Sequence, residues 1–88
     1  MDSIARELGI RTKGEFSEDG SYVINLPNSD EWGKVYSIID DNEEVEKMTD
    51  NSLVQDDGAS LLYRYKGVQI NLLADLFGDS YQVVFTEI

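Results

Sequence analysis

The segment from Leu61 to Leu72 constrains the fold most, because apolar and polar residues alternate through it on both sides of the dipeptide Lys66-Gly67. Such alternation is typical of β-strands with one buried face, and a two-residue turn ending in glycine is a common connection within a tight hairpin. A slip of one residue would turn every side chain to the other face, so the pattern predicts one register. The predicted opposite pairs, all on one face, are Tyr65 with Val68, Tyr63 with Ile70 and Leu61 with Leu72.

The same alternation predicts further strands before and after this hairpin. A turn at Asp57-Gly58 would pair Val54 with Leu61, on the face just described. Residues 14–27 predict another hairpin that turns near Asp19-Gly20, while the register of its first arm stays open because several loop lengths would close it. Alternation puts three residues on one face of the second arm and three on one face of the last strand: Tyr22, Ile24 and Leu26, and Tyr81, Val83 and Phe85.

Between these hairpins, residues 28–40 predict an amphipathic helix. Asn28 or Ser29 can cap its N-terminus, and Glu31 completes a capping box with Asn28. A shorter helix is predicted from Ser3 to Leu8, where a glycine follows, and both docking and fraying of that helix stay open. The apolar stripe of the main helix consists of Trp32, Val35, Tyr36 and Ile39.

These elements predict an α+β fold: an antiparallel β-sheet of four to six strands with one main amphipathic helix packed on one face, plus a short N-terminal helix. At 88 residues the chain has the length of one domain, and we expect residues 1–88 to form it. Val45 and Met48 do not decide whether residues 43–48 form an edge strand or an irregular connection. The second face of the sheet is expected to be mixed, with Leu62, Leu73 and Val84 among Arg64, Lys66, Gln69, Asn71, Gln82 and Thr86.

The residue types that are missing exclude most catalytic chemistry. The chain has no histidine and no cysteine, which removes the usual general base and the thiolate nucleophile. An EF-hand loop beginning at Asp40 would need glycine at its sixth position and glutamate at its twelfth, where Val45 and Asn51 stand. We therefore expect a non-enzymatic protein without a cofactor or metal, with a catalytic carboxylate pair or a weak divalent-ion site in residues 40–44 as the chemical alternatives.

The charge of the chain indicates what kind of partner it can bind. Eighteen acidic residues against seven basic ones give a net charge of −11, which repels the phosphates of nucleic acids and of membrane surfaces. We expect no direct binding to nucleic acid or membrane, and a basic protein as the partner. The apolar runs are too short to span a bilayer and the first ten residues resemble no secretory signal, so we expect a cytoplasmic protein.

The stretch from Asp40 to Asp50 contains six carboxylates and one lysine. Acids are favoured locally in turns, and a negative surface maintains solubility, which is the simplest interpretation. A polar connection does not require so many acids, however, and acids at the C-terminal end of a helix are mildly unfavourable. We therefore predict a surface that contacts a basic partner, formed by Asp40, Asp41, Glu43, Glu44, Glu46, Asp50, Asp56, Asp57, Asp30 and Glu31.

The function predicted from this surface is that of a nucleic-acid mimic, whose carboxylates occupy the basic cleft of a DNA- or RNA-binding enzyme and inhibit it. In size and charge the chain is similar to phage and mobile-element inhibitors of restriction enzymes and CRISPR nucleases, although it shares no motif with them. The alternative is a structural or assembly module that pairs through a sheet edge, using the final strand and the mixed second face, with acidity serving only solubility. Both hypotheses leave the identity of the partner and the oligomeric state open.

Overall fold

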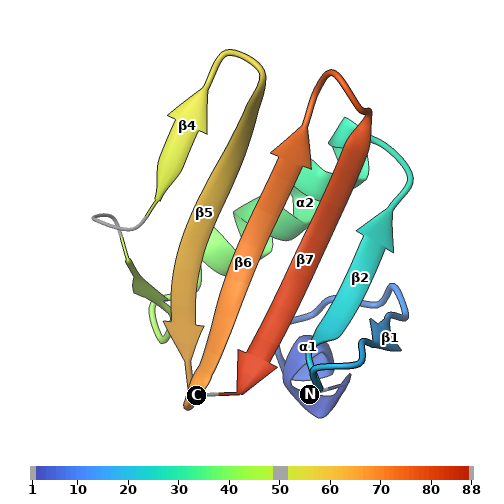
Figure 1. Ribbon diagram of the computed structural model, residues 1–88. Coiled ribbons are helices and arrows are strands. Elements are labelled where there is room, and N and C mark those ends of the chain that lie inside the picture. Colours follow the sequence, from blue (N-terminus) through green and yellow to red (C-terminus); the bar gives the residue numbers. More distant parts are fainter. Residues whose placement is uncertain (1, 49–51, 88) are drawn as a thin grey trace.

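The computed structural model describes residues 2–48 and 52–87. One antiparallel sheet is covered on one face by helix α2 (Ser29–Asp40), and the short helix α1 (Asp2–Glu7) lies near one end of the sheet (Figure 1). The predicted α+β fold is confirmed. The strands are β1 (Glu15–Phe16), β2 (Tyr22–Leu26), β3 (Glu46–Lys47), β4 (Leu53–Gln55), β5 (Gly58–Tyr65), β6 (Val68–Asp75) and β7 (Ser80–Glu87).

The strand order is β1-β2-β7-β6-β5-β3, with β4 also paired to β5. The described residues thus form seven strands where the sequence predicted four to six. The additional strand is β3, which has two residues and lies in the segment 43–48 that the sequence leaves open between strand and connection. So short a piece carries too few alternating positions to be separated from a loop by its sequence.

The β5–β6 hairpin confirms the register predicted from the sequence. Lys66 and Gly67 have φ angles of 48° and 77°, and positive φ at both central positions is what a type I′ turn requires. The observed opposite pairs include Tyr65 with Val68, Tyr63 with Ile70 and Leu61 with Leu72. Tyr63 and Tyr65 are buried, as residues on the core-facing side should be.

The predicted register of the preceding hairpin is wrong. Val54 lies opposite Ala59 rather than Leu61, and the turn consists of Asp56 and Asp57. Gly58 belongs to β5, where an added Cβ would collide with the carbonyl oxygen of Ala74 on β6. This glycine therefore permits a close approach of two strands instead of forming the turn. Because the register moves by two positions, Val54 keeps its predicted face.

The last strand, β7, lies in the interior of the sheet. It pairs with β2 on one side and with β6 on the other, so its backbone is not available to a partner strand. The hypothesis of assembly through this strand is wrong for that reason. The positions at the sides of the sheet belong instead to β1 and to the short strands β3 and β4.

The core lies between the sheet and the two helices. Val35 and Ile39 of α2 are buried in it, and Trp32 packs against it while its ring stacks on that of Tyr36 at 5.9 Å. Helix α1 docks rather than frays, because Ala5, Leu8 and Ile10 are buried. The largest fully buried side chains are Phe85, Ile24, Ile39, Ile70, Leu72 and Val83.

The second face of the sheet is turned toward the viewer in Figure 1, and helix α2 lies behind the opposite face. Leu62, Leu73 and Val84 are only partly buried there, among amide and hydroxyl side chains, so the predicted mixed character is confirmed. The open question about residues 43–48 is answered by β3, which pairs with β5 over two residues. Within the described part of the chain, neither helix is long and apolar enough to cross a membrane.

Candidate functional site

The acids of the predicted contact surface lie in three separate regions of the structure. Asp30 and Glu31 lie in the first turn of α2, whereas Asp40 lies in its last turn, roughly 15 Å away at about 1.5 Å per residue. Asp56 and Asp57 form the β4–β5 turn, near the upper end of the sheet in Figure 1. Asp50 lies outside the described residues. The predicted acids therefore do not form one continuous cluster.

The acids that follow α2 differ in their surroundings. Asp40 is tied to the fold, because its Oδ1 accepts a hydrogen bond from the Tyr63 hydroxyl at 3.2 Å and lies 3.1 Å from the ammonium of Lys47. Four neighbouring acids are exposed: Asp41, Glu43, Glu44 and Glu46, which we call the helix-exit acids. Within the described part of the chain these four have no Lys or Arg partner.

Two turns meet at the upper end of the sheet. The backbone N–H of Leu76, in the β6–β7 turn, donates to the carbonyl oxygen of Asp57, in the β4–β5 turn, at 2.9 Å. Asp75 and Asp79 are thereby brought beside the predicted pair of aspartates. We call Asp56, Asp57, Asp75 and Asp79 the tip acids, and all four are exposed.

Tyr81 connects the same end of the sheet to the start of α2. Burial raises the pKa of the Tyr81 phenol, and the charge of Asp79 raises that pKa further, whereas a hydrogen bond with Ser29 lowers it. Ser29 and Asp79 therefore both lie beside this ring. Asp30 and Glu31, which follow Ser29, share this end of the molecule with the tip acids.

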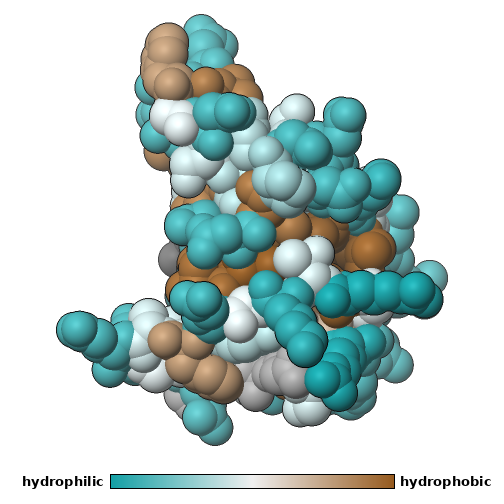
Figure 2. All heavy atoms as spheres, turned by 90° about the vertical axis from the view of Figure 1, so that its right-hand side faces the viewer, coloured by the Kyte–Doolittle hydropathy of each residue, from teal (hydrophilic) through white to brown (hydrophobic). Residues whose placement is uncertain are grey.

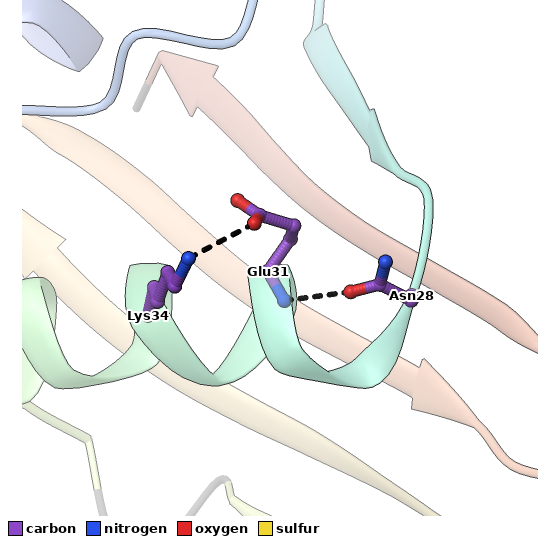
Figure 3. A network of polar contacts seen from close by, with 3 residues as sticks. All are labelled: Asn28, Glu31 and Lys34. Atoms are coloured by element: carbon purple, nitrogen blue, oxygen red, sulfur yellow. Dashed lines mark hydrogen bonds and ion pairs between the residues drawn. The ribbon is translucent and has the colours of Figure 1, made fainter.

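The N-terminus of α2 has the predicted Asn28 cap, but the predicted capping box is incomplete, because the Glu31 side chain does not return to the Asn28 N–H. The side-chain oxygen of Asn28 accepts the backbone N–H of Glu31 at 2.9 Å, which satisfies one of the free donors of the first turn (Figure 3). The Glu31 carboxylate turns to the ammonium of Lys34 at 3.1 Å. Glu31 is thus partly neutralised within the helix, and Asp30 is the more available of the two acids.

Large apolar side chains stand among the tip acids. Leu53, Val54, Leu76 and Phe77 expose 56%, 72%, 54% and 88% of their surfaces. Figure 2 shows hydrophobic residues at the projecting upper end of the molecule, next to hydrophilic ones. A shallow cavity of about 320 Å³ lies beside them, between β4, β5 and the end of β6. The tip therefore combines negative charge with apolar surface.

The sequence reasoning missed Asp75, Asp79 and the apolar part of this surface. A local signal was available, because Leu76 and Phe77 are two large apolar residues inside a turn that also contains glycine and aspartate. Apolar residues in such a turn have no strand or helix to bury them. The contact of Leu76 with Asp57, however, depends on pairing between segments that are distant in the sequence.

The acids of the described chain are spread over its surface rather than gathered at one point. In residues 2–48 and 52–87, no three carboxylates come close enough together to hold a metal ion. Searches for similar proteins give no further indication: no protein-family model, curated protein or solved structure matches this chain.

Proposed function

We propose that this protein is a small, acidic, non-enzymatic binding protein of the cytoplasm, which occupies the basic cleft of a DNA- or RNA-binding enzyme and inhibits it by excluding nucleic acid. The observation that supports this proposal is that most of the exposed carboxylates are not paired with a Lys or Arg of the described chain. In the described part of the chain, Glu7, Glu31 and Asp40 are the acids in ion pairs, whereas the helix-exit acids and the tip acids have no Lys or Arg partner.

The mechanism follows from electrostatics. A cleft that binds nucleic acid holds Lys and Arg side chains at phosphate positions, and exposed carboxylates can pair with the same cations. The net charge of −11 accelerates the encounter with such a cleft, and this acceleration falls as salt increases. Phe77 and its apolar neighbours supply contact area that excludes water around the tip.

The experiment compares three variants that each remove two negative charges. Glu43→Gln with Glu44→Gln alters the helix-exit acids, and Asp56→Asn with Asp57→Asn alters the tip acids. The matched control, Glu15→Gln with Glu18→Gln, changes exposed acids on β1 and in the turn after it. Since all three change the net charge equally, a difference between them reports the site rather than the total field.

The measurement is affinity capture from a nucleic-acid-depleted cell lysate at low and high salt, followed by activity assays of the captured proteins. We expect a nucleic-acid enzyme that is released by salt, displaced by duplex DNA or RNA, and inhibited by the purified protein. At least one site variant should weaken its binding about tenfold, roughly 1.4 kcal/mol, while the control stays near the unmodified protein. Equal binding by all three variants would contradict the proposal.

The second candidate is an assembly module, which the uncovered second face of the sheet favours. Leu62, Leu73 and Val84 are partly exposed there among amide and hydroxyl side chains, and the exposed Arg64 lies on the same face. Face-to-face pairing would produce self-association that persists at high salt, because apolar contact is not screened. Sedimentation of the purified protein at low and high salt distinguishes this candidate from the inhibitor.

A further inference from the structure

The chain carries a basic region that its overall acidity hides. Three of its seven Lys and Arg residues, Arg6, Arg11 and Lys13, lie within eight positions of one another. They line a cavity of about 440 Å³ beside the loop that follows α1. A second cavity of about 260 Å³ shares Arg6 and Lys13 with the first and is bordered by Phe16 and Tyr22. Two hollows with common cationic walls thus adjoin one another.

The fold anchors this loop at both ends. Leu8 and Ile10 are buried in the core, and the N–H of Ile10 donates to the carbonyl of Ala5 at 2.9 Å. Farther along, the N–H of Gly14 donates to the hydroxyl of Tyr22 at 2.8 Å. The backbone between these anchors is therefore restrained, while the side chains of residues 11–13 face solvent. Restraint of this kind lowers the entropy lost when a ligand binds.

Arg11 and Lys13 differ from the lysines elsewhere in the described chain in having no ion-pair partner. Lys34, Lys47 and Lys66 each pair with a carboxylate. Arg11 and Lys13 have no carboxylate partner in the described ranges. The acid nearest in sequence on α1, Glu7, is held by Lys66 at 2.7 Å, and Glu15 on β1 is exposed without a cation. Arg11 and Lys13 therefore bring unpaired positive charge to the wall of the first cavity.

An aromatic surface borders the same place. Phe16 exposes 64% of its surface, and its ring centre lies 5.1 Å from that of Tyr22, which fixes one side of it. An exposed ring beside arginine and lysine suits a ligand that is anionic at one end and flat at the other. Arginine and lysine bind phosphate by charge-assisted hydrogen bonds, and a nucleobase stacks on an aromatic ring.

We propose that these two cavities form a binding site for a small organic phosphate with a flat ring, the chemistry of a mononucleotide. Its phosphate lies against Arg11 and Lys13, and its ring lies on Phe16. A compact anion meets mainly the charges within a Debye length, about 8 Å at physiological salt. A nucleic-acid strand would extend onto the acidic surface and be repelled, so the site selects a single nucleotide. This inference is independent of the proposed inhibitor function.

The test is isothermal titration calorimetry of the full chain with adenosine monophosphate, inorganic phosphate and adenosine as separate probes. We expect adenosine monophosphate to bind about tenfold more tightly than inorganic phosphate, the order that base stacking on an aromatic side chain contributes. Adenosine, which lacks the anion, should bind more weakly than adenosine monophosphate. A long single-stranded oligonucleotide should bind no more tightly than the mononucleotide.

Three variants assign the binding to this place. Arg11→Gln with Lys13→Gln should weaken both anionic probes at least tenfold, and Phe16→Ala should weaken adenosine monophosphate to the level of phosphate. The matched control is Arg64→Gln with Lys34→Gln, which also removes two exposed positive charges, both outside the two cavities. No binding of adenosine monophosphate by the folded protein, or an equal loss in the control, overturns the proposal. Phosphate binding as tight as that of the nucleotide overturns it too, because the ring would then contribute nothing.

Discussion

Tyr63 is a core residue whose side chain binds the first acid of the predicted acidic stretch. Its ring is buried on β5, its hydroxyl donates to Asp40 at 3.2 Å, and Asp40 also lies 3.1 Å from the ammonium of Lys47. Burial, and then the negative charge of Asp40, raise the pKa of Tyr63 well above its ordinary value. At the scale of the residue, Asp40 therefore serves the fold, and only the acids beyond it are free for a partner.

The raised pKa of Tyr63 predicts how stability changes in alkali. The folded protein retains the phenolic proton at a pH where the unfolded chain, with a pKa of about 10, releases it. The resulting stabilisation is complete below pH about 10 and is lost as pH rises toward the folded-state pKa. Urea unfolding should show this decline, and Tyr63→Phe should make it shallower.

The same variant has a second expected effect at neutral pH. Removing the hydroxyl leaves Asp40 without one hydrogen bond, which should lower the free energy of unfolding by about 1 kcal/mol. Tyr81, whose pKa is also raised, keeps part of the alkaline decline in both proteins. An unchanged alkaline slope in Tyr63→Phe would contradict the account given for this pair.

At the scale of the element, two glycines have opposite roles. Gly33 lies in the middle of α2, where glycine lowers helix stability because it loses more backbone freedom than other residues on folding. Gly67 closes the β5–β6 turn with a φ angle of 77°, in the region that residues with a Cβ avoid. At both positions an added Cβ would meet no heavy atom within 4 Å, so packing does not distinguish them.

Alanine substitutions at these positions should therefore change stability in opposite directions. Gly33→Ala should raise the free energy of unfolding by about 0.5 to 1 kcal/mol. Gly67→Ala should lower it by about 1 to 2 kcal/mol, the cost of a left-handed conformation for a residue with a Cβ. Urea denaturation of the two variants checks both values. Changes of the same sign would show that the backbone conformation is not the cause.

At the scale of the whole molecule, we expect the repulsion among the acidic side chains to be stronger than the attraction within the ion pairs. The ion pairs of Lys34 with Glu31, Lys47 with Asp40 and Lys66 with Glu7 lie at the surface, with Asp40 half-buried, and surface pairs contribute at most about 1 kcal/mol each. The net charge is −11. The molecule measures 31 × 26 × 23 Å, comparable to the Debye length of about 30 Å at 0.01 M salt. At that salt concentration its acids repel one another across the whole fold.

Sodium chloride should therefore stabilise this protein. Raising its concentration from about 0.01 M to about 0.15 M shortens the Debye length to about 8 Å and screens the repulsion. We expect the melting temperature to rise, as measured by calorimetry in chloride rather than in sulfate, which stabilises proteins by exclusion from their surface. The control variant with Glu15→Gln and Glu18→Gln should respond less steeply. A melting temperature that falls with salt would show that the ion pairs dominate.

The sequence by itself determined the features that depend on neighbouring residues. Alternation around Lys66-Gly67 fixed the register of β5 with β6, and the spacing from Asn28 to Ile39 fixed α2, its cap and its buried side. Composition determined the net charge and the lack of histidine and cysteine. These features were readable because helices and tight hairpins are specified by residues close in the chain.

The tertiary structure decided the features that depend on distant segments. Gly58 permits the close approach of β5 to Ala74 on β6 instead of forming a turn, and β7 lies between β2 and β6 instead of at an edge. Pairing across the sheet also brings Asp57 beside the turn of Asp75 and Asp79, and folding of α1 against the core gathers Arg11 and Lys13 around a cavity. No local sequence pattern predicts these contacts, because they depend on which strands pair and where the helices pack.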